Sequence, residues 1–137
     1  MIFGIGIDLI SNQRIKTTIN KFKQNFENKI FTENELKDFN KKFSKRILNS
    51  SPQINFLAKR FASKEAFSKA LGTGIGRGIN FNDIEIFNDD LGKPNIRIIN
   101  DKNKILEKII GTKNYNIHLT ISDEKSISVA MVIIEKL

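Results

Sequence analysis

The stretch Phe61–Gly78 reads FASKEAFSKALGTGIGRG, and its small residues decide the fold that we expect. Alanine recurs every fourth residue through this stretch and just before it, at Ala58, Ala62, Ala66 and Ala70. This spacing places the alanines on one face of a helix, where a neighbouring segment can pack closely. We therefore expect a long helix over residues 54–71 that Gly72 ends.

The second half of the stretch combines glycines with charged side chains. Its backbone carries little side-chain bulk, so its amides can approach an anion, at Gly72, Thr73, Gly74, Gly76 and Gly78. Lys64, Lys69 and Arg77 add positive charge, and Glu65 lies one helical turn before Lys69. The combination predicts a site for Mg²⁺ and phosphate. The alternative is a surface pair beside a glycine helix cap. A GK[ST] sequence and GxGxxG are both absent, which excludes the two common nucleotide loops.

Composition limits the possible chemistry. The 137 residues are expected to form one domain over 1–137, long enough to bury a single core. The chain has no cysteine and one histidine, which excludes disulfides, thiol catalysis and histidine-built metal sites. A metal here would have oxygen ligands. The net charge of +8 favours an acidic partner such as nucleic acid, an anionic cofactor or an acidic protein.

The N-terminal residues 1–10 alternate as a strand does. Ile5 and Ile7 fall on one side, and Gly4, Gly6 and Asp8 fall on the other. Asp8, near the end of the strand, fits a turn or cap as well as a functional site. The first residues lack a positively charged leader, and no apolar run reaches membrane-spanning length. We therefore expect a cytosolic protein without a membrane segment.

Two further helices are expected before the long one. From Arg14 onward an apolar face has helical spacing, at Ile15, Ile19, Phe22 and Phe26. Its outer surface is mostly basic, through Arg14, Lys16, Lys21 and Lys23. Thr32 and Glu35 have the spacing of a capping box, so a second helix is expected there with Leu36 and Phe39 inward. Residues 40–51 are polar and lysine-rich, which predicts a loop.

Strands dominate the second half of the chain. Residues 84–86 and 96–98 alternate around the turn at 88–94, which predicts a hairpin. A short helix over 101–110, closed by Gly111, and strands over 115–122 and 127–135 follow. The first of these strands aligns Asn116, His118, Thr120 and Ser122 on one face. We expect an α+β fold, with a mainly antiparallel sheet packed against the long helix and shorter helices.

Four segments together resemble a known family. They are GIGIDLI at 4–10 with Arg14, FLAKRFASKEAFSKALGTGI at 56–75, NDDLGKP at 88–94 and HLTISDE at 118–124. In this order and at these separations, they are similar to the bacterial holo-acyl-carrier-protein synthases, the small class of phosphopantetheinyl transferases. The resemblance implies the phosphopantetheinyl transferase fold. It also implies transfer of the phosphopantetheine arm of coenzyme A to a serine of apo acyl carrier protein, for fatty acid biosynthesis, with release of adenosine 3',5'-bisphosphate.

The resemblance also implies roles for individual residues. Asp8 and Glu65 match the family's Mg²⁺ ligands, which implies that they are the catalytic pair. The positions that match the coenzyme-binding segments are Lys64, Lys69, Gly72, Thr73, Gly74, Lys93, Pro94, His118, Thr120 and Ser122. The family implies a homotrimer with sites at subunit interfaces. Ser11 is a departure, because the family commonly has a glutamate there.

The basic helix is the surface that we expect the carrier protein to contact. Acyl carrier proteins are acidic, so we expect Arg14 and Lys21 to bind the carrier by charge complementarity. Two alternatives come from other classes. A small basic nucleic-acid-binding module explains the charge but not the carboxylates amid glycines and lysines. A non-catalytic coenzyme A binder would need only the glycine loop and lysines, and Asp8 would be dispensable to it. The general base and the range of carriers modified do not follow from the sequence.

Overall fold

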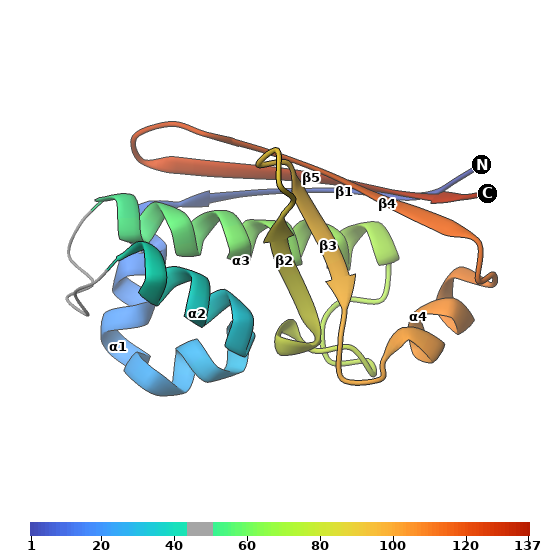
Figure 1. Cartoon of the computed structure of the whole chain (residues 1–137), viewed down its shortest axis with the longest axis horizontal. Coiled ribbons are helices and arrows are strands. Elements are labelled where there is room, and N and C mark those ends of the chain that lie inside the picture. The colour runs from blue at the N-terminus through green and yellow to red at the C-terminus, as the bar shows by residue number, and fades with distance from the viewer. Residues whose placement is uncertain (44–50) are drawn as a thin grey trace.

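Helix α3 (Ser51–Leu71) lies at the centre of the molecule, and most of the other elements pack around it (Figure 1). The structure is a computed structural model that describes residues 1–43 and 51–137, without the side chains of Lys23 and Gln24. Fourteen of the 21 residues of α3 are buried, which is why the helix has no single apolar stripe. The four alanines expected on its packing face, Ala58, Ala62, Ala66 and Ala70, are all buried.

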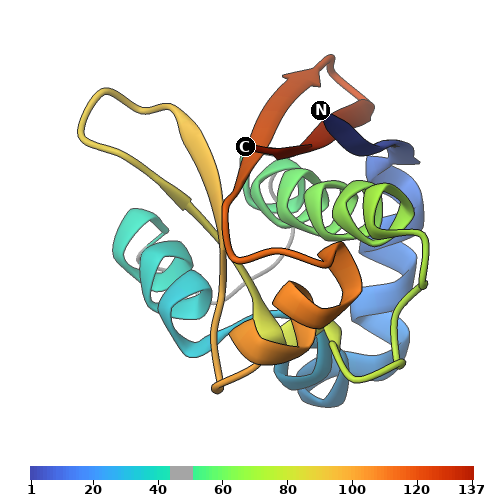
Figure 2. The same ribbon diagram turned by 90° about the vertical axis from the view of Figure 1, so that its right-hand side faces the viewer.

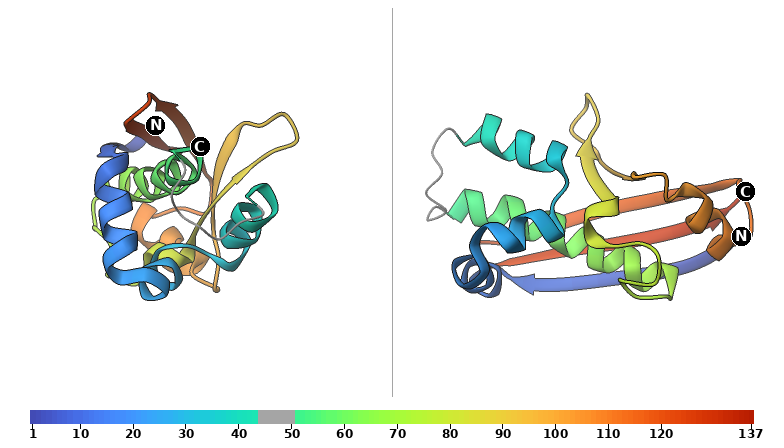
Figure 3. Two further views of the ribbon diagram at one scale, coloured as in Figure 1. Left: turned by 90° about the vertical axis from the view of Figure 1, so that its left-hand side faces the viewer. Right: turned by 90° about the horizontal axis from the view of Figure 1, so that it is seen from below.

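A three-stranded antiparallel sheet lies across one side of α3. It contains β1 (Ile2–Ser11), β5 (Ile127–Lys136) and β4 (Tyr115–Asp123), in the order β1-β5-β4. A separate hairpin pairs β2 (Ile84–Asn88) with β3 (Pro94–Ile98). The α+β fold is thus confirmed, with two antiparallel sheets in place of one. Figure 3 shows both termini at one end of the three-stranded sheet, where the Met1 ammonium donates to the Lys136 carbonyl at 2.7 Å.

The shorter helices lie on the side of α3 away from this sheet (Figure 2). They are α1 (Asn12–Ile30), α2 (Glu33–Lys42) and α4 (Asn103–Ile110), with the short helix η1 (Phe81–Asp83) before β2. The capping box of Thr32 and Glu35 is present at the start of α2, and Gly111 ends α4 in the left-handed conformation. Of the predicted loop at 40–51, residues 40–42 belong to α2 and Ser51 to α3, and 44–50 lie outside the described residues.

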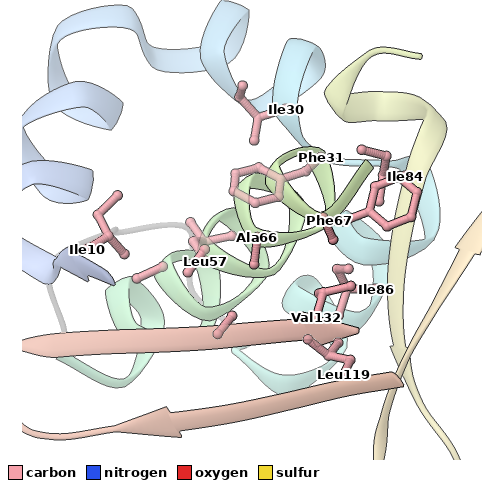
Figure 4. Close-up of a cluster of buried hydrophobic side chains, with 14 of the residues drawn as sticks. Ile10, Ile30, Phe31, Leu57, Ala66, Phe67, Ile84, Ile86, Leu119 and Val132 are labelled. Carbon is pink, nitrogen blue, oxygen red and sulfur yellow. The ribbon is translucent and has the colours of Figure 1, made fainter. Parts of the chain in front are cut away.

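The hydrophobic core surrounds α3 on most sides. Figure 4 shows Leu57, Ala66 and Phe67 of the helix between Ile30 and Phe31 on one side and Val132 and Leu119 of the sheet on the other. Ile15 and Ile19 of α1 are buried as expected, but Phe22 is 52% exposed. Helical spacing alone placed Phe22 on the apolar face, and α1 turns it to solvent.

Strand β1 rests on α3 through its glycines. A Cβ at Gly4 would lie 1.9 Å from the carbonyl oxygen of Ala70, and one at Gly6 would lie 1.9 Å from that of Ala66. The strand alternates as predicted, but the glycine face is the one buried within the chain. The apolar face is exposed, through Ile5, Ile7 and Leu9. Only glycine allows this approach of strand to helix.

We expect Gly6→Ala to destabilise the fold by more than about 3 kcal/mol, because the clash is with backbone that cannot rotate away. Gly76→Ala is the matched control, since its Cβ would meet nothing within 4 Å and only its positive φ is strained. That strain costs about 1 kcal/mol. Urea unfolding at one protein concentration compares the two. Equal losses would show that the close contact of β1 with α3 is dispensable.

Candidate functional site

Asp8 and Lys69 meet where β1 passes α3. Asp8 follows Gly4 and Gly6 on the same face of the strand, so its side chain points toward the helix. The Lys69 ammonium donates to Asp8 Oδ1 at 2.9 Å and to the Ile7 carbonyl at 2.9 Å. The Asp8 side chain is only 14% exposed, whereas that of Lys69 is 53% exposed. The pair is therefore open to solvent, and to a ligand, from the lysine side.

Glu65 belongs to the same cluster. It lies half-buried on α3, one turn before Lys69. Burial raises the pKa of its carboxyl, and the Asp8 carboxylate raises that pKa further, whereas Lys69 and Arg14 lower it. The structure thus brings together the two carboxylates that the sequence predicted, although they are 57 positions apart.

These carboxylates suit a hard cation. Two carboxylates that lie close together at the edge of a cleft repel each other, and a divalent ion bound between them replaces this repulsion with attraction. The described residues contain no group of three or more His, Cys, Asp or Glu side chains that could hold a metal. The protein would supply two ligands, and substrate phosphate and water would supply the others, which is how Mg²⁺ is usually bound.

A cleft of about 520 Å³ opens beside these residues. Its lining consists of Glu65, Ser68, Lys69, Gly72, Gly74, Ile75 and Phe81. Gly72 and Gly74 have φ values of 78° and 72°, a conformation that side chains rarely adopt. Neither would meet another atom within 4 Å if it had a Cβ, so the space beside both is open to a ligand, although the Gly72 amide itself donates to the Ser68 and Lys69 carbonyls. Thr73 lies between them, and its hydroxyl donates a hydrogen bond to the Gly74 carbonyl. The cleft therefore combines exposed backbone, a lysine and a carboxylate.

Lys64 does not belong to this cleft, which corrects the prediction that it binds the coenzyme. Its side chain is completely buried and forms an ion pair with Glu35 at 2.6 Å. Its ammonium also donates to the carbonyls of Ile30 and Phe81. Burial lowers the pKa of Lys64, and the Glu35 carboxylate opposes that shift. Successive helix residues point about 100° apart, so Lys64 faces the core while Glu65 faces the cleft.

Lys93 and Pro94 lie away from this cleft, at the turn of the β2–β3 hairpin. Pro94 lines a separate hollow of about 220 Å³ with Lys42, Lys59 and Arg60. The Arg60 guanidinium stacks on Phe56 at 3.5 Å, and its Nε is the one buried side-chain nitrogen or oxygen in the described part of the chain without a hydrogen-bond partner. The Lys59 ammonium lies 3.8 Å from Oδ1 of Asp123. Asp123 also lines this second hollow, whose three cationic side chains leave it with a net positive charge.

His118, Thr120 and Ser122 lie on the outer face of the sheet, as the alternation predicted. Asp8 lies on the inner face, and β5 separates its strand from β4. His118 Nε2 lies 3.1 Å from Glu135 Oε2. One chain therefore does not bring His118 to the carboxylate pair. These outer residues share their face with the exposed isoleucines of β1.

The basic helix begins beside the site. Ser11 caps α1 by accepting from the Arg14 amide at 3.1 Å. Arg14 and Lys21 are exposed, and Arg14 is near enough to Glu65 to affect its pKa. The side chain of Lys23 is outside the described residues. A helix that starts next to the carboxylates can present a bound partner to them.

Sequence reasoning missed Arg60, Ser68 and Phe81. Ser68 could have been found, because it follows Glu65 by three residues on the same helix face. Arg60 lies in the sequence KRF just before the alanine-rich part of the helix, but nothing in that sequence distinguishes a buried arginine from a surface one. Phe81 reaches the cleft through the turn after the glycine loop, and the sequence carries no signal for it.

The chain matches the model of the 4'-phosphopantetheinyl transferase superfamily over residues 4–126. It is 42% identical over 135 residues to the holo-[acyl-carrier-protein] synthase of Pelagibacter ubique (strain HTCC1062), with 98% of each chain covered. It is also similar to the crystal structure of the Neisseria meningitidis holo-[acyl-carrier-protein] synthase, with 38% identity, a TM-score of 0.84 and coverage of 99% of this chain and 100% of that one.

A further similar structure is a holo-(acyl-carrier-protein) synthase from Bacillus anthracis in complex with CoA (3',5'-ADP). It is 39% identical with a TM-score of 0.78, and covers 100% of this chain and 99% of that one. Because the family model spans residues 4–126 and a relative aligns over nearly the whole length, the chain belongs to the holo-[acyl-carrier-protein] synthase family of 4'-phosphopantetheinyl transferases.

Proposed function

We propose that this protein transfers the 4'-phosphopantetheine arm of coenzyme A to a serine of apo acyl carrier protein. The serine hydroxyl oxygen bonds to the phosphorus that bears the pantetheine arm and releases its proton to the surrounding water. The bond from this phosphorus to the bridging oxygen breaks, and adenosine 3',5'-bisphosphate leaves with the electron pair. The observation that supports the proposal is the convergence of Asp8, Glu65 and Lys69 at a glycine-lined cleft in a chain of this family. Fatty acid biosynthesis is the process that we propose for it.

The residues at the cleft would have different roles in binding a pyrophosphate. Asp8 and Glu65 would hold Mg²⁺, which when bound neutralises charge on the phosphates. Lys69 can turn from Asp8 to the phosphates, since its ammonium is the exposed member of the pair. The Gly74 amide can reach a phosphate oxygen because the space beside this residue is open, whereas the Gly72 amide donates to the Ser68 and Lys69 carbonyls at the end of α3. Such a transfer needs positioning and charge neutralisation more than a covalent catalyst.

The direct test is incubation of the protein with coenzyme A, Mg²⁺ and an apo acyl carrier protein. Mass spectrometry of the carrier should show the added arm on its serine. A carrier that stays unmodified, while coenzyme A still binds, would identify a non-catalytic coenzyme binder. None of the helices in the described part of the chain is long and apolar enough to cross a membrane. A cytosolic location stays a prediction.

We expect Asp8→Asn and Glu65→Gln each to lower turnover by about two orders of magnitude or more, because each removes an anionic metal ligand and keeps the side-chain size. The double variant should lose little more than either single variant, since one change already disables the ion. Turnover is measured by mass spectrometry at saturating coenzyme A and Mg²⁺. Chelation should abolish wild-type transfer, and added Mg²⁺ should restore it.

Glu107→Gln is the matched control, because Glu107 is a carboxylate on α4 that does not line the cleft. It should keep wild-type turnover. Wild-type rates in both site variants, or transfer that persists after exhaustive chelation, would show that the carboxylates are structural.

The exposed face of the three-stranded sheet supports assembly into a trimer. In register across the strands, Ile7 pairs with Met131, which pairs with Thr120. The rows on either side of this one also join apolar residues of β1 and β5 to a polar residue of β4. A largely apolar surface therefore lies beside the polar face of the strand that bears His118. Ile5 and Ile7 are each 58% exposed. Large apolar patches on a small protein usually mark an interface. We propose that this face is buried between three copies, with His118 and Thr120 contributing to a neighbour's site.

We expect light scattering to give three chains per particle, and Ile7→Lys to give folded monomers with little activity, because a charge cannot be buried in the interface. Leu91→Lys is the control, since Leu91 is 96% exposed at the hairpin turn and lies off the sheet face. It should remain trimeric and active. A wild-type chain that is monomeric and active at assay concentration would refute shared sites.

Mixing of variants tests the shared site directly. Chains with Asp8→Asn and chains with His118→Ala should each be impaired alone. After unfolding and refolding together they should regain about a quarter of wild-type activity, the share of interfaces that combine two intact residues when chains mix at random. No recovery on mixing would place both residues in the same chain's site or outside it.

Helix α1 is the surface that we propose for the carrier. We expect charge reversal at Arg14 and Lys21 together to raise KM for the carrier and to weaken its salt dependence. Lys21→Glu alone is the sharper test, because Arg14 also influences Glu65. Coenzyme affinity should not change in it. Lys108→Glu on α4 makes the same change in net charge and should leave carrier kinetics intact. An unaltered KM in Lys21→Glu would remove this part of α1 from the interface.

A further inference from the structure

The ammonium of Lys64 joins three segments to α3. It donates to the Ile30 carbonyl at the end of α1, to Glu35 Oε1 in the first turn of α2 at 2.6 Å, and to the Phe81 carbonyl of η1 at 3.0 Å. A lysine ammonium has three donors, so this one is fully satisfied. Its side chain has no exposed surface. Figure 4 shows Ile30 and Phe31 lying against α3.

One of these partners forms a wall of the cleft. Phe81 lines the cleft together with Glu65 and Ser68, and its ring stacks on Phe61 of α3 with ring centroids 5.5 Å apart. Lys64 is the residue before Glu65. The same turn of α3 therefore presents Glu65 to the cleft on one side and is fastened on its other side to the backbone of the opposite wall.

Glu35 extends this linkage. Its Oε1 accepts from the Thr32 amide at 2.8 Å, and its Oε2 accepts from the Ile86 amide at 3.0 Å. An apolar pair of the same volume would often stabilise a core as well as a buried ion pair does. An apolar pair could not, however, make the hydrogen bonds by which Lys64 and Glu35 hold the backbone of four segments in place. Stability alone therefore does not explain a charged pair here.

We propose that Lys64 is a positioning residue of the coenzyme cleft, one that sets the separation between Phe81 and the turn of α3 bearing Glu65 and Lys69. It acts through Phe81 and never touches the substrate, because it is buried. The inference rests on the proposed function only in naming coenzyme A as the occupant of the cleft.

The test is the paired variant Lys64→Met with Glu35→Gln, which removes both charges and leaves no buried charge unpaired. Leu106→Ala is the control, because Leu106 is fully buried on α4 and contacts none of the three fastened segments through a hydrogen bond. We expect it to lower stability without altering the cleft, because Leu106 is buried in the core and does not line the cleft. Hydrogen exchange is measured at the amides of 80–84, and KM and kcat for coenzyme A are measured at a temperature where every variant is folded.

We expect the paired variant to exchange faster at 80–84 and to raise KM for coenzyme A, each by about tenfold or more, because small displacements of binding groups are costly. Leu106→Ala should match wild type in both. Wild-type exchange at 80–84 together with a wild-type coenzyme KM in the paired variant would overturn the positioning role.

Failure of the proposed function is distinguishable from failure of this inference. A wild-type protein that transfers nothing to the carrier contradicts the reaction, whereas exchange at 80–84 tests the fastening of η1 without any substrate. If the paired variant does not fold, Glu35→Gln alone preserves the side-chain volume and an oxygen acceptor for Lys64. It should shift the same two quantities in the same direction, and no shift in either would overturn the inference.

Discussion

The contact between the glycines of β1 and the alanines of α3 is the constraint on which the rest of the structure depends. Gly4 and Gly6 lie so close to the helix that a Cβ on either would overlap the carbonyl oxygen of Ala70 or Ala66. This contact decides which face of the strand turns inward. Asp8 follows on that face and reaches the helix, because successive inward residues are two positions apart. The same choice turns the isoleucines of β1 outward, so one steric requirement produces both a carboxylate at the cleft and an apolar outer surface.

Two adjacent residues of α3 show how a central helix serves the core and the site together. Lys64 is buried among backbone carbonyls and Glu35, and Glu65 is half-exposed beside Asp8. Desolvation of an ammonium costs several kcal/mol unless it is paired and fully hydrogen-bonded, a condition that Lys64 meets. Because the helix is enclosed on most sides, the direction of each side chain depends on its neighbours in space. Charge type alone therefore does not separate the structural lysine from a ligand-binding one.

The sequence predicted the elements better than it predicted where their side chains lie. The long helix, the capping box, the hairpin and the alternation of β4 were recognisable because each depends on residues close in the chain. The position of Lys64 was predicted wrongly, since the buried helix has no apolar stripe from which its inner face could be read. Phe22 was placed inside for a similar reason, because helical spacing does not show how far α1 stays covered. The meeting of Asp8 with Lys69 needed the resemblance as well, because 61 positions separate them.

Strand order explains why the residues implied for one site lie apart in a single chain. Alternation correctly grouped His118 and Thr120, but it contains no information that β5 lies between their strand and β1. In the structure Asp8 and His118 are on opposite faces of the sheet, with a layer of side chains and backbone between them. No rotamer change brings them together, because the sheet itself stands in the way. If both act on one coenzyme, a second chain must supply one of them. The apolar row beside His118 is a surface on which such a chain can pack, so assembly and completion of the site would be the same event.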